Sequence, residues 1–407
     1  MSFQDTCQYL FARQAGRIKW SLGPTLALLE ALGHPERQFP SIHVGGTNGK
    51  GSTCAFLSAA LQARGFRVGV YTSPHLVSVR ERVTVDDVPL SEAALVEWVR
   101  FLRPHIERHD ASFFEAMTAI GFADLAARAV DVGVVEVGLG GRLDATNVIT
   151  PLVSVVTKIA LEHTDYLGPD LASIAREKAG IAKPGVPFVT GEQAPDVRAV
   201  LVDEAERLGA KPIVRVDTSR PPPSGFRLGL RGAHQWANAW VALGALNALP
   251  APYRYDGPGL PPAFAAARVP GRFEVRGRWI FDVAHNPDGM AVLVQALQAH
   301  HARRPLHALV GIRNDKDWRP MLTQILPEVD RVVLTVAPTV PAHQRWGLVD
   351  LAGWTDDRVI GQPVVFEPDF ARALELVQEG AETMLVTGSF HTVGDALAAL
   401  PGFAPVG

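Results

Sequence analysis

The chain has 407 residues, of which 47% are hydrophobic and 20% charged, and its formal net charge at pH 7 is −3. This composition excludes a disordered chain, and the small net charge gives no global attraction to nucleic acid or to an anionic membrane. The length predicts two or three domains rather than a single core.

The cysteine content and the N-terminal segment indicate the compartment. Only Cys7 and Cys54 are present, so neither a disulfide framework nor a cysteine-rich metal site can form. The first residues lack the basic-then-apolar pattern of a signal peptide, and no apolar run reaches membrane-spanning length. We therefore expect a cytoplasmic protein that binds neither nucleic acid nor membranes.

Short apolar segments alternate with helical patterns through the first half of the chain. Strands are predicted at Arg67–Thr72, Val132–Val137, Leu152–Thr157, Val186–Thr190 and Pro212–Val216, and helices at Ser91–Arg103, Phe113–Val130 and Leu171–Ile181. This alternation is typical of a doubly wound, mostly parallel sheet. A further strand, Phe226–Leu230, and a long helix, His234–Leu249, complete this part.

A Pro- and Gly-rich stretch from Leu249 to Pro262 then interrupts the pattern, with a short helix allowed at Ala263–Arg268. Beyond it a second α/β series begins. Its predicted strands are Trp279–Val283, Leu306–Ile312, Val332–Val336, Val364–Glu367 and Met384–Thr387, and its helices are Pro287–Ala299, Phe370–Glu379 and Thr392–Leu400. We expect a larger P-loop-type domain over residues 1–269 and a smaller Rossmann-like domain over residues 270–407.

The glycine-rich stretch Gly46–Ser52 follows the apolar run Ser41–Val44 and precedes a helical pattern. Its glycines allow backbone N–H groups to face phosphates, the helix N-terminus adds positive potential, and Lys50 adds a mobile charge. The spacing departs from the Walker pattern, because Val44 occupies the position of the first glycine of that pattern and Gly51 separates Lys50 from Ser52. A flexible turn is the alternative, but the strand and helix on either side favour a nucleoside triphosphate site.

Polar residues also follow other predicted strands. Glu136 ends a strand before the turn-rich Gly138–Asn147, and a carboxylate there suits Mg²⁺ bridging two phosphates, although it could instead cap backbone N–H groups. His163 lies where another strand runs into a loop, and Lys178 lies near the end of a helix; a satisfied polar residue and a solvated lysine are the respective alternatives. The segment Tyr71–Leu76 is equally ambiguous, because Pro74 alone explains its break.

Taken together, these motifs resemble the folylpolyglutamate synthase/dihydrofolate synthase family, a branch of the Mur-ligase-like ATP-dependent amide ligases. The matching stretches are His43–Ser52, Tyr71–Leu76, Phe113–Glu115, Glu136–Asn147, Glu177–Gly185, His234-Gln235 with Asn238-Ala239, Pro270–Arg272, Asp282–Pro287 and Gly388-Ser389. They cover nearly the whole chain in order. The resemblance implies a ligase of folate biosynthesis and one-carbon metabolism, with a Mur-ligase-like ATP-binding domain followed by a glutamate-ligase domain.

The resemblance also implies roles for individual residues. ATP would be held by Thr47, Asn48, Gly49, Lys50, Gly51, Ser52, Asn238, Arg272, Asp282 and His285. Two Mg²⁺ ions would be held by Ser73, Glu136, His163 and Lys178, the lysine as a carbamate, and the catalytic set would be Lys50, Glu136, His163 and Lys178. The folate-type substrate would contact Phe113, Phe114, Glu115, Ala116, Asp144 and Ala145.

The implied reaction joins L-glutamate to dihydropteroate, to the γ-carboxyl of a reduced folate, or to both. It proceeds through an acyl phosphate and releases ADP and phosphate in a monomeric enzyme, and a monovalent cation is a further expected cofactor. Some positions depart from the family pattern: Val283 replaces a glycine, Glu162 replaces an aspartate, and Val269 replaces a tryptophan. A cell-wall Mur ligase acting on a UDP-sugar and a non-enzymatic P-loop switch are the alternatives.

Overall fold

Strand β1 (Ser41–Gly45) is central to an eight-stranded sheet in the computed structural model, which describes residues 1–14, 21–255, 259–347 and 363–403. The strand order is β4-β3-β2-β5-β1-β6-β7-β8. The remaining strands are β2 (Val68–Tyr71), β3 (Val83–Val85), β4 (Val88–Pro89), β5 (Val132–Glu136), β6 (Val153–Val156), β7 (Phe188–Thr190) and β8 (Ile213–Arg215). Neighbouring strands pair in parallel except for β2 with β3 and β3 with β4, which pair antiparallel.

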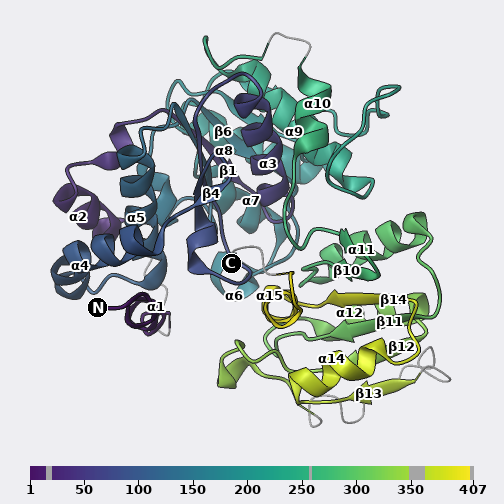
Figure 1. Cartoon of the computed structure of the whole chain (residues 1–407). Coiled ribbons are helices and arrows are strands. Elements are labelled where there is room, and N and C mark those ends of the chain that lie inside the picture. Colours follow the sequence, from purple (N-terminus) through teal and green to yellow (C-terminus); the bar gives the residue numbers. More distant parts are fainter. Residues whose placement is uncertain (15–20, 256–258, 348–362, 404–407) are drawn as a thin grey trace. The chain divides into compact units, whose positions relative to one another are not determined.

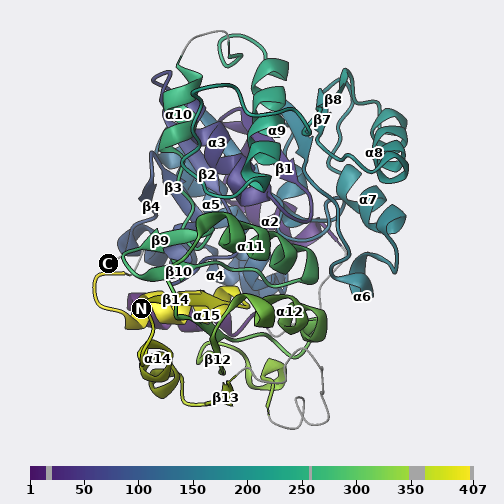
Figure 2. The same ribbon diagram turned by 90° about the vertical axis from the view of Figure 1, so that its right-hand side faces the viewer.

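The helices of this part follow from strand burial, because every residue of β1, β5 and β6 is buried and both faces of the sheet must be covered. Helices α1, α2, α4 and α5 pack together, and α10 packs beside α3 (Figures 1 and 2). The bounds are α1 (Phe3–Phe11), α2 (Gly23–Ala31), α3 (Lys50–Gln62), α4 (Glu92–Arg108), α5 (Phe113–Ala127), α6 (Thr164–Leu167), α7 (Leu171–Ala179), α8 (Pro195–Arg207), α9 (His234–Ala248) and α10 (Leu260–Ala266).

A second, six-stranded sheet has the order β13-β12-β11-β14-β10-β9, in which only β9 is antiparallel. Its strands are β9 (Glu274–Arg276), β10 (Trp279–Phe281), β11 (Leu306–Val310), β12 (Arg331–Leu334), β13 (Val364–Phe366) and β14 (Thr383–Thr387). Its helices are α11 (Pro287–His300), α12 (Trp318–Ile325), α14 (Phe370–Gln378) and α15 (Phe390–Ala399). Apolar clusters fill both faces of this sheet.

Short 3₁₀ segments connect several of these elements: η1 (Pro35–Arg37), η2 (Val79–Arg82), η3 (Ala145–Val148), η4 (Leu326–Glu328) and η5 (Ala342–Gln344). The described residues divide into two compact units. Unit 1 holds Met1–Pro74, Val79–Gly229 and Trp236–Ala267, and unit 2 holds His75–Ser78, Leu230–Gln235 and the chain from Arg268 onward. Among the described residues, no helix is both long and apolar enough to cross a membrane.

The predicted α/β class with two mostly parallel sheets is confirmed, but one predicted strand is absent and several helix and strand ends differ from the predicted bounds. Phe226–Leu230 contains no strand, because Gly229 N donates to Phe264 O (2.9 Å) instead of entering a ladder. Helix α4 continues past Pro104 to Arg108, since Leu102 and Ile106 are buried on its core face. Helix α15 begins at Phe390 because the Ser389 side chain caps it by accepting a hydrogen bond from Thr392 N.

Candidate active site

The loop between β1 and α3 is a turn that only glycine can make. Gly46 and Gly49 have φ angles of 135° and 94°, and a Cβ on Gly49 would collide with the side-chain oxygen of Asn238 from α9. The backbone N–H of Thr47 donates to Lys158 O (2.8 Å), which fixes the loop on the end of β6. The structure therefore brings Asn238 to the loop, as the predicted nucleotide pocket requires.

The start of α3 leaves backbone donors for an anion. Gly49 is the N-cap residue and supplies no side-chain hydrogen bond, so the first N–H groups of the helix have no side-chain acceptor from that position. Lys50, the first helical residue, donates through Nζ to Thr47 O (3.1 Å) across the loop. A helix N-terminus with an adjacent lysine suits a phosphate chain.

Glu136 is the last residue of β5, and its carboxylate faces the start of α3. The side chain is buried, and Oε2 accepts from Ser73 N (3.1 Å), two residues beyond β2. A Cβ on Gly51 would lie 3.9 Å from both carboxylate oxygens. Because β2, β5 and β1 are parallel neighbours, Ser73, Glu136 and the phosphate loop come together at the C-terminal ends of these strands.

Lys178, on α7, reaches the same loop from the other side. Its ammonium group is buried and donates to Gly46 O (2.9 Å). Burial, with the nearby charge of Lys50 as the second cause, lowers the pKa of Lys178 to about 7. An amine that is partly neutral at physiological pH is a nucleophile, and this sets Lys178 apart from a solvated lysine.

Close glycine contacts fix the position of α7 against the loop that follows β5. A Cβ on Gly141 would lie 2.5 Å from Glu177 O and 2.9 Å from Lys178 O. On the other side, Arg142 N donates to Glu177 O (2.9 Å), and a Cβ on Gly180 would meet the Arg142 backbone. The two segments interlock without room for a methyl group, and this rigidity holds Lys178 in place.

His163 follows β6 and caps α6 with a left-handed backbone, φ 52°. Its ring Nε2 lies 3.8 Å from Glu162 Oε1, and the Glu162 charge is one of the groups that act on Lys178. Because β6 is next to β1, this loop leaves the same edge of the sheet as the phosphate loop. The metal-binding role of His163 stays a prediction.

Asp144 is buried in the loop that follows β5, and the protein itself occupies both of its oxygens. Oδ2 accepts from Leu139 N (2.8 Å), while Oδ1 accepts from Thr146 N (3.0 Å) and from the Thr146 hydroxyl (2.5 Å). Burial raises the pKa of Asp144, and these hydrogen bonds oppose the shift. The carboxylate thus shapes the turn, and a pterin contact at Asp144 or the buried Ala145 stays a prediction.

The segment Phe113–Ala116 opens α5 and is largely committed to the fold. Phe113 and Ala116 are buried in the core cluster, and Glu115 closes a capping box with Ser112. The Phe114 ring lies against Gly138, where a Cβ would collide with it. Phe114 therefore contacts the loop that follows β5, and substrate contact by this segment stays a prediction.

In unit 2, two of the predicted nucleotide residues, Arg272 and His285, lie beside Phe390 at the start of α15. The Arg272 guanidinium lies 5.1 Å from the Phe390 ring, and the His285 ring lies 5.3 Å from it. Asp282 accepts from Phe273 N (2.8 Å) and Ala284 N (2.9 Å), and burial raises its pKa. Phe390, which follows Gly388-Ser389 directly, was not singled out from the sequence, and its contacts with Arg272 and His285 appear only in the structure.

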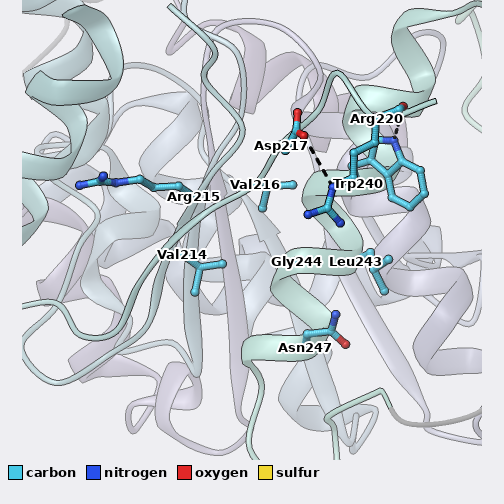
Figure 3. Close-up of a pocket in the computed structure, with 9 residues that line it drawn as sticks. All are labelled: Val214, Arg215, Val216, Asp217, Arg220, Trp240, Leu243, Gly244 and Asn247. Atoms are coloured by element: carbon cyan, nitrogen blue, oxygen red, sulfur yellow. Dashed lines mark hydrogen bonds and ion pairs between the residues drawn. The ribbon is translucent and has the colours of Figure 1, made fainter. Parts of the chain in front are cut away.

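A separate pocket of about 170 Å³ lies in unit 1 between β8 and α9 (Figure 3). In Figure 3, Trp240, Leu243, Gly244 and Asn247 line it from α9, while Arg215 points away. None of the predicted site residues lines this pocket. Trp240 Nε1 donates to Arg220 O (3.2 Å), which ties the pocket rim to the helix.

The phosphate loop beside buried Glu136 and Lys178, followed by a separate α/β unit, defines an ATP-dependent ligase of the Mur-ligase type. Residues 271–390 match the family described as Mur ligase, glutamate ligase domain. The dihydrofolate synthase/folylpolyglutamate synthase of Mycobacterium tuberculosis is 38% identical over 93% of this chain and 90% of its own length. The Escherichia coli protein of the same name is 35% identical over 87% of this chain and 85% of its own.

Solved structures give the same result. The structure of Mycobacterium tuberculosis folylpolyglutamate synthase complexed with ADP has a TM-score of 0.85, 35% identity and 97% coverage of both chains. Escherichia coli FolC in complex with DHPP and ADP has a TM-score of 0.85 and 31% identity, covering 98% of this chain and 97% of FolC. The chain belongs to the dihydrofolate synthase/folylpolyglutamate synthase family, and it is an ADP-forming ligase that joins an acid to an amino acid.

Proposed function

We propose that this enzyme adds L-glutamate to dihydropteroate, to the γ-carboxyl group of reduced folates, or to both, at the expense of ATP. The observation that carries the proposal is the convergence of Glu136, Lys178 and Asn238 on one glycine loop in a chain of this family. The relatives' names refer to both activities, and these names favour the folate branch over a cell-wall ligase.

The proposed route activates the acceptor as an acyl phosphate. The acceptor carboxylate attacks the γ-phosphorus of ATP, the bond to the β-phosphate oxygen breaks, and ADP leaves. The amine of L-glutamate then attacks the acyl carbon, phosphate leaves, and one amine proton is released. Phosphoryl transfer requires positioning and charge neutralisation, and Lys50 and the N–H groups at the start of α3 supply both for the phosphates.

Magnesium fits the donors at this edge of the sheet. Glu136 and Ser73 offer hard oxygens, and the described residues contain no group of three or more His, Cys, Asp or Glu side chains that would form a complete protein cage. Mg²⁺ keeps waters and takes phosphate oxygens beside one or two carboxylates, so such a partial set suits it. Ser73, Glu136, His163 and Lys178 would hold two ions, which neutralise phosphate charge when bound.

Lys178 is proposed to be the carbamate ligand. Its neutral amine attacks CO₂, a C–N bond forms, and loss of one proton leaves an anionic carboxylate on the side chain. The pKa of about 7 supports this step, because an ordinary lysine is almost fully protonated at neutral pH. The carbamate therefore places a negatively charged oxygen ligand beside Lys50, where the unmodified lysine would carry a positive charge.

The remaining assignments complete the proposal. Residues 1–269 form the ATP-binding domain and residues 270–407 the glutamate-ligase domain, and Arg272, Asp282 and His285 contribute to the nucleotide from the second domain. The enzyme is expected to act as a cytoplasmic monomer, with a monovalent cation as a further cofactor. Sedimentation of the pure protein checks the monomer.

Single-turnover ligation tests the proposal. The protein is incubated with ATP, Mg²⁺, L-glutamate and one acceptor at a time: dihydropteroate, a tetrahydrofolate, a UDP-muramoyl peptide, or none. Mass spectrometry reads the product, and ADP is measured in parallel. Glutamylated pteroate or folate supports the proposal. A glutamylated UDP-muramoyl product assigns a cell-wall ligase, and ADP release that needs no acceptor assigns an NTPase switch.

A further inference from the structure

A buried hydrogen-bonded chain joins strand β1 to the loop that follows β5. His43 Nε2 lies 2.8 Å from Thr146 Oγ1, and Thr146 Oγ1 lies 2.5 Å from Asp144 Oδ1. His43 and Thr146 are completely buried, and Asp144 is 5% exposed. The proposed reaction uses none of the atoms of His43, although a histidine inside a sheet is costly to bury.

The acceptor at the end of this chain fixes the direction of every hydrogen bond. An ionised carboxylate only accepts, so the Thr146 hydroxyl donates to Asp144, and its oxygen in turn accepts from His43 Nε2–H. His43 must therefore carry a proton on Nε2. Burial, with the charge of Lys183 as the second cause, lowers the pKa of His43 to about 3, so the ring is neutral at physiological pH and Nδ1 carries no proton.

His43 carries a penalty that an apolar residue would avoid. Its Nδ1 is then a bare acceptor, and it has no hydrogen-bond partner among the described residues. A buried acceptor without a donor costs about 1–3 kcal/mol. Among the described residues, the bond between Nε2 and Thr146 is the only hydrogen bond that this ring makes, so any effect of the imidazole passes through Thr146.

The turn at Thr146 is a junction of three site elements. Strand β1 enters the phosphate loop three residues after His43, and Asp144 closes the loop that starts at Gly138. The next residue, Asn147, donates through Nδ2 to Gly180 O (3.1 Å) just beyond α7. The His43 chain thus anchors the loop after β5 to the strand that carries the phosphate loop.

We propose that His43 is a positioning residue for the acceptor substrate. Through Thr146 it holds Asp144, and with it the loop Gly138–Asp144, at a fixed distance from the phosphate loop. The proposal rests on the proposed function in one respect, the assignment of that loop to the acceptor. The backbone of β1 is held by its ladders with β5 and β6 whatever side chain stands at position 43, so ATP binding does not depend on the imidazole.

The test compares three single variants and one double variant of the whole chain. His43→Leu removes the donor, Thr146→Val removes the hydroxyl, and His43→Gln keeps a side-chain N–H of similar reach. We expect His43→Leu and Thr146→Val to raise the acceptor KM roughly five- to a hundred-fold with the KM for ATP unchanged, and His43→Gln to restore much of the loss. The double variant His43→Leu/Thr146→Val should be no worse than either single one.

A matched control separates positioning from loss of stability. His307 is another buried histidine in a strand, bonded through Nδ1 to Val377 O (3.2 Å) in unit 2. His307→Leu should lower the melting temperature without raising the acceptor KM. If His43→Leu does the same, or if the two singles add fully in the double variant, the proposal is wrong.

Nitrogen NMR of the wild-type protein tests the geometry without any turnover. We expect His43 to show the Nε2–H tautomer and no titration between pH 5 and pH 8, and an Nδ1–H tautomer or an ordinary titration overturns the chain. A wild-type protein that makes no glutamylated product refutes the proposed function instead, and the NMR result still decides the hydrogen-bonded chain.

Discussion

Carbamoylation of Lys178 offers the sharpest test of the site, because its pH dependence follows from one number. With a pKa of about 7, about half of the Lys178 side chains are neutral at pH 7. For a lysine of ordinary pKa 10.5 the neutral fraction is roughly 0.03%. At equal access to CO₂, Lys178 should therefore react faster than an exposed lysine at that pH, by less than this ratio of neutral fractions, because an amine of lower pKa is a weaker nucleophile.

The perturbation is a pH series at fixed dissolved CO₂, and the assay is incorporation of ¹³C label at the Lys178 side chain, read by NMR. Because the rate follows the neutral amine, it should rise about tenfold between pH 6 and pH 8 and then level off. Lys178→Arg is the control, since guanidinium keeps the charge and does not form the carbamate.

Two outcomes would refute the reasoning. An exposed lysine of ordinary pKa gives about a hundredfold rise over the same interval with no plateau, and that profile at Lys178 would mean that burial does not lower its pKa. Absence of label in an enzyme that turns over would remove the carbamate from the mechanism.

Three further predictions follow from single contacts. Lys50→Ala should lower ligation roughly a hundredfold or more while circular dichroism stays unchanged, because Lys50, which lies across the glycine loop, is proposed to neutralise phosphate charge. Lys211→Ala is the control, and wild-type-like turnover of Lys50→Ala would end the phosphate-site assignment. Asp144→Ala should reduce kcat/KM for dihydropteroate by a factor that corresponds to about 1–3 kcal/mol, and should reduce kcat/KM for tetrahydrofolate less. Equal losses for the two acceptors would indicate that Asp144 has a general folding role. The pKa of His43 is about 3 in the folded state and 6.5 in the unfolded state, so the unfolded chain takes up the proton first as the pH falls. Between pH 7 and pH 5 the free energy of unfolding, measured with urea, should therefore fall by about 2 kcal/mol more for the wild type than for His43→Gln. Equal decreases would contradict the buried neutral ring.

The strongest periodic signals in the sequence predicted most of the sheet. The segments around Val132–Val137 and Leu152–Thr157 became β5 and β6 almost as predicted, because strands buried on both faces are continuous apolar runs. The short strands β3, β4 and β9 went unpredicted, since two or three residues give no period. The segment Phe226–Leu230 was wrongly predicted as a strand, because Phe226 packs against Trp236 and Phe264 and Gly229 N bonds to Phe264 O, contacts that the local sequence does not encode.

For the site, sequence motifs indicated which residues matter but not how they act. Glu136 and Lys178 were singled out from their places after a strand and on a helix, yet the contact of Lys178 with Gly46 O joins segments 132 residues apart. Asp144 was predicted as a substrate contact, and its engagement by Leu139 and Thr146 depends on a fold of the loop that no local pattern encodes. His43 looked like one polar residue in an apolar strand, and its partner lies 103 residues away.

The left-handed N-cap of α3 has a consequence for how the protein is stabilised. Serine, threonine and aspartate, which close most helix starts, are strained at a φ of 94°, and their Cβ would strike Asn238. A side chain at position 49 therefore cannot cap the helix. A bound phosphate can accept hydrogen bonds from the first N–H groups instead. Nucleotide that binds the folded state alone adds to the free energy of unfolding, so the melting temperature should rise with nucleotide occupancy.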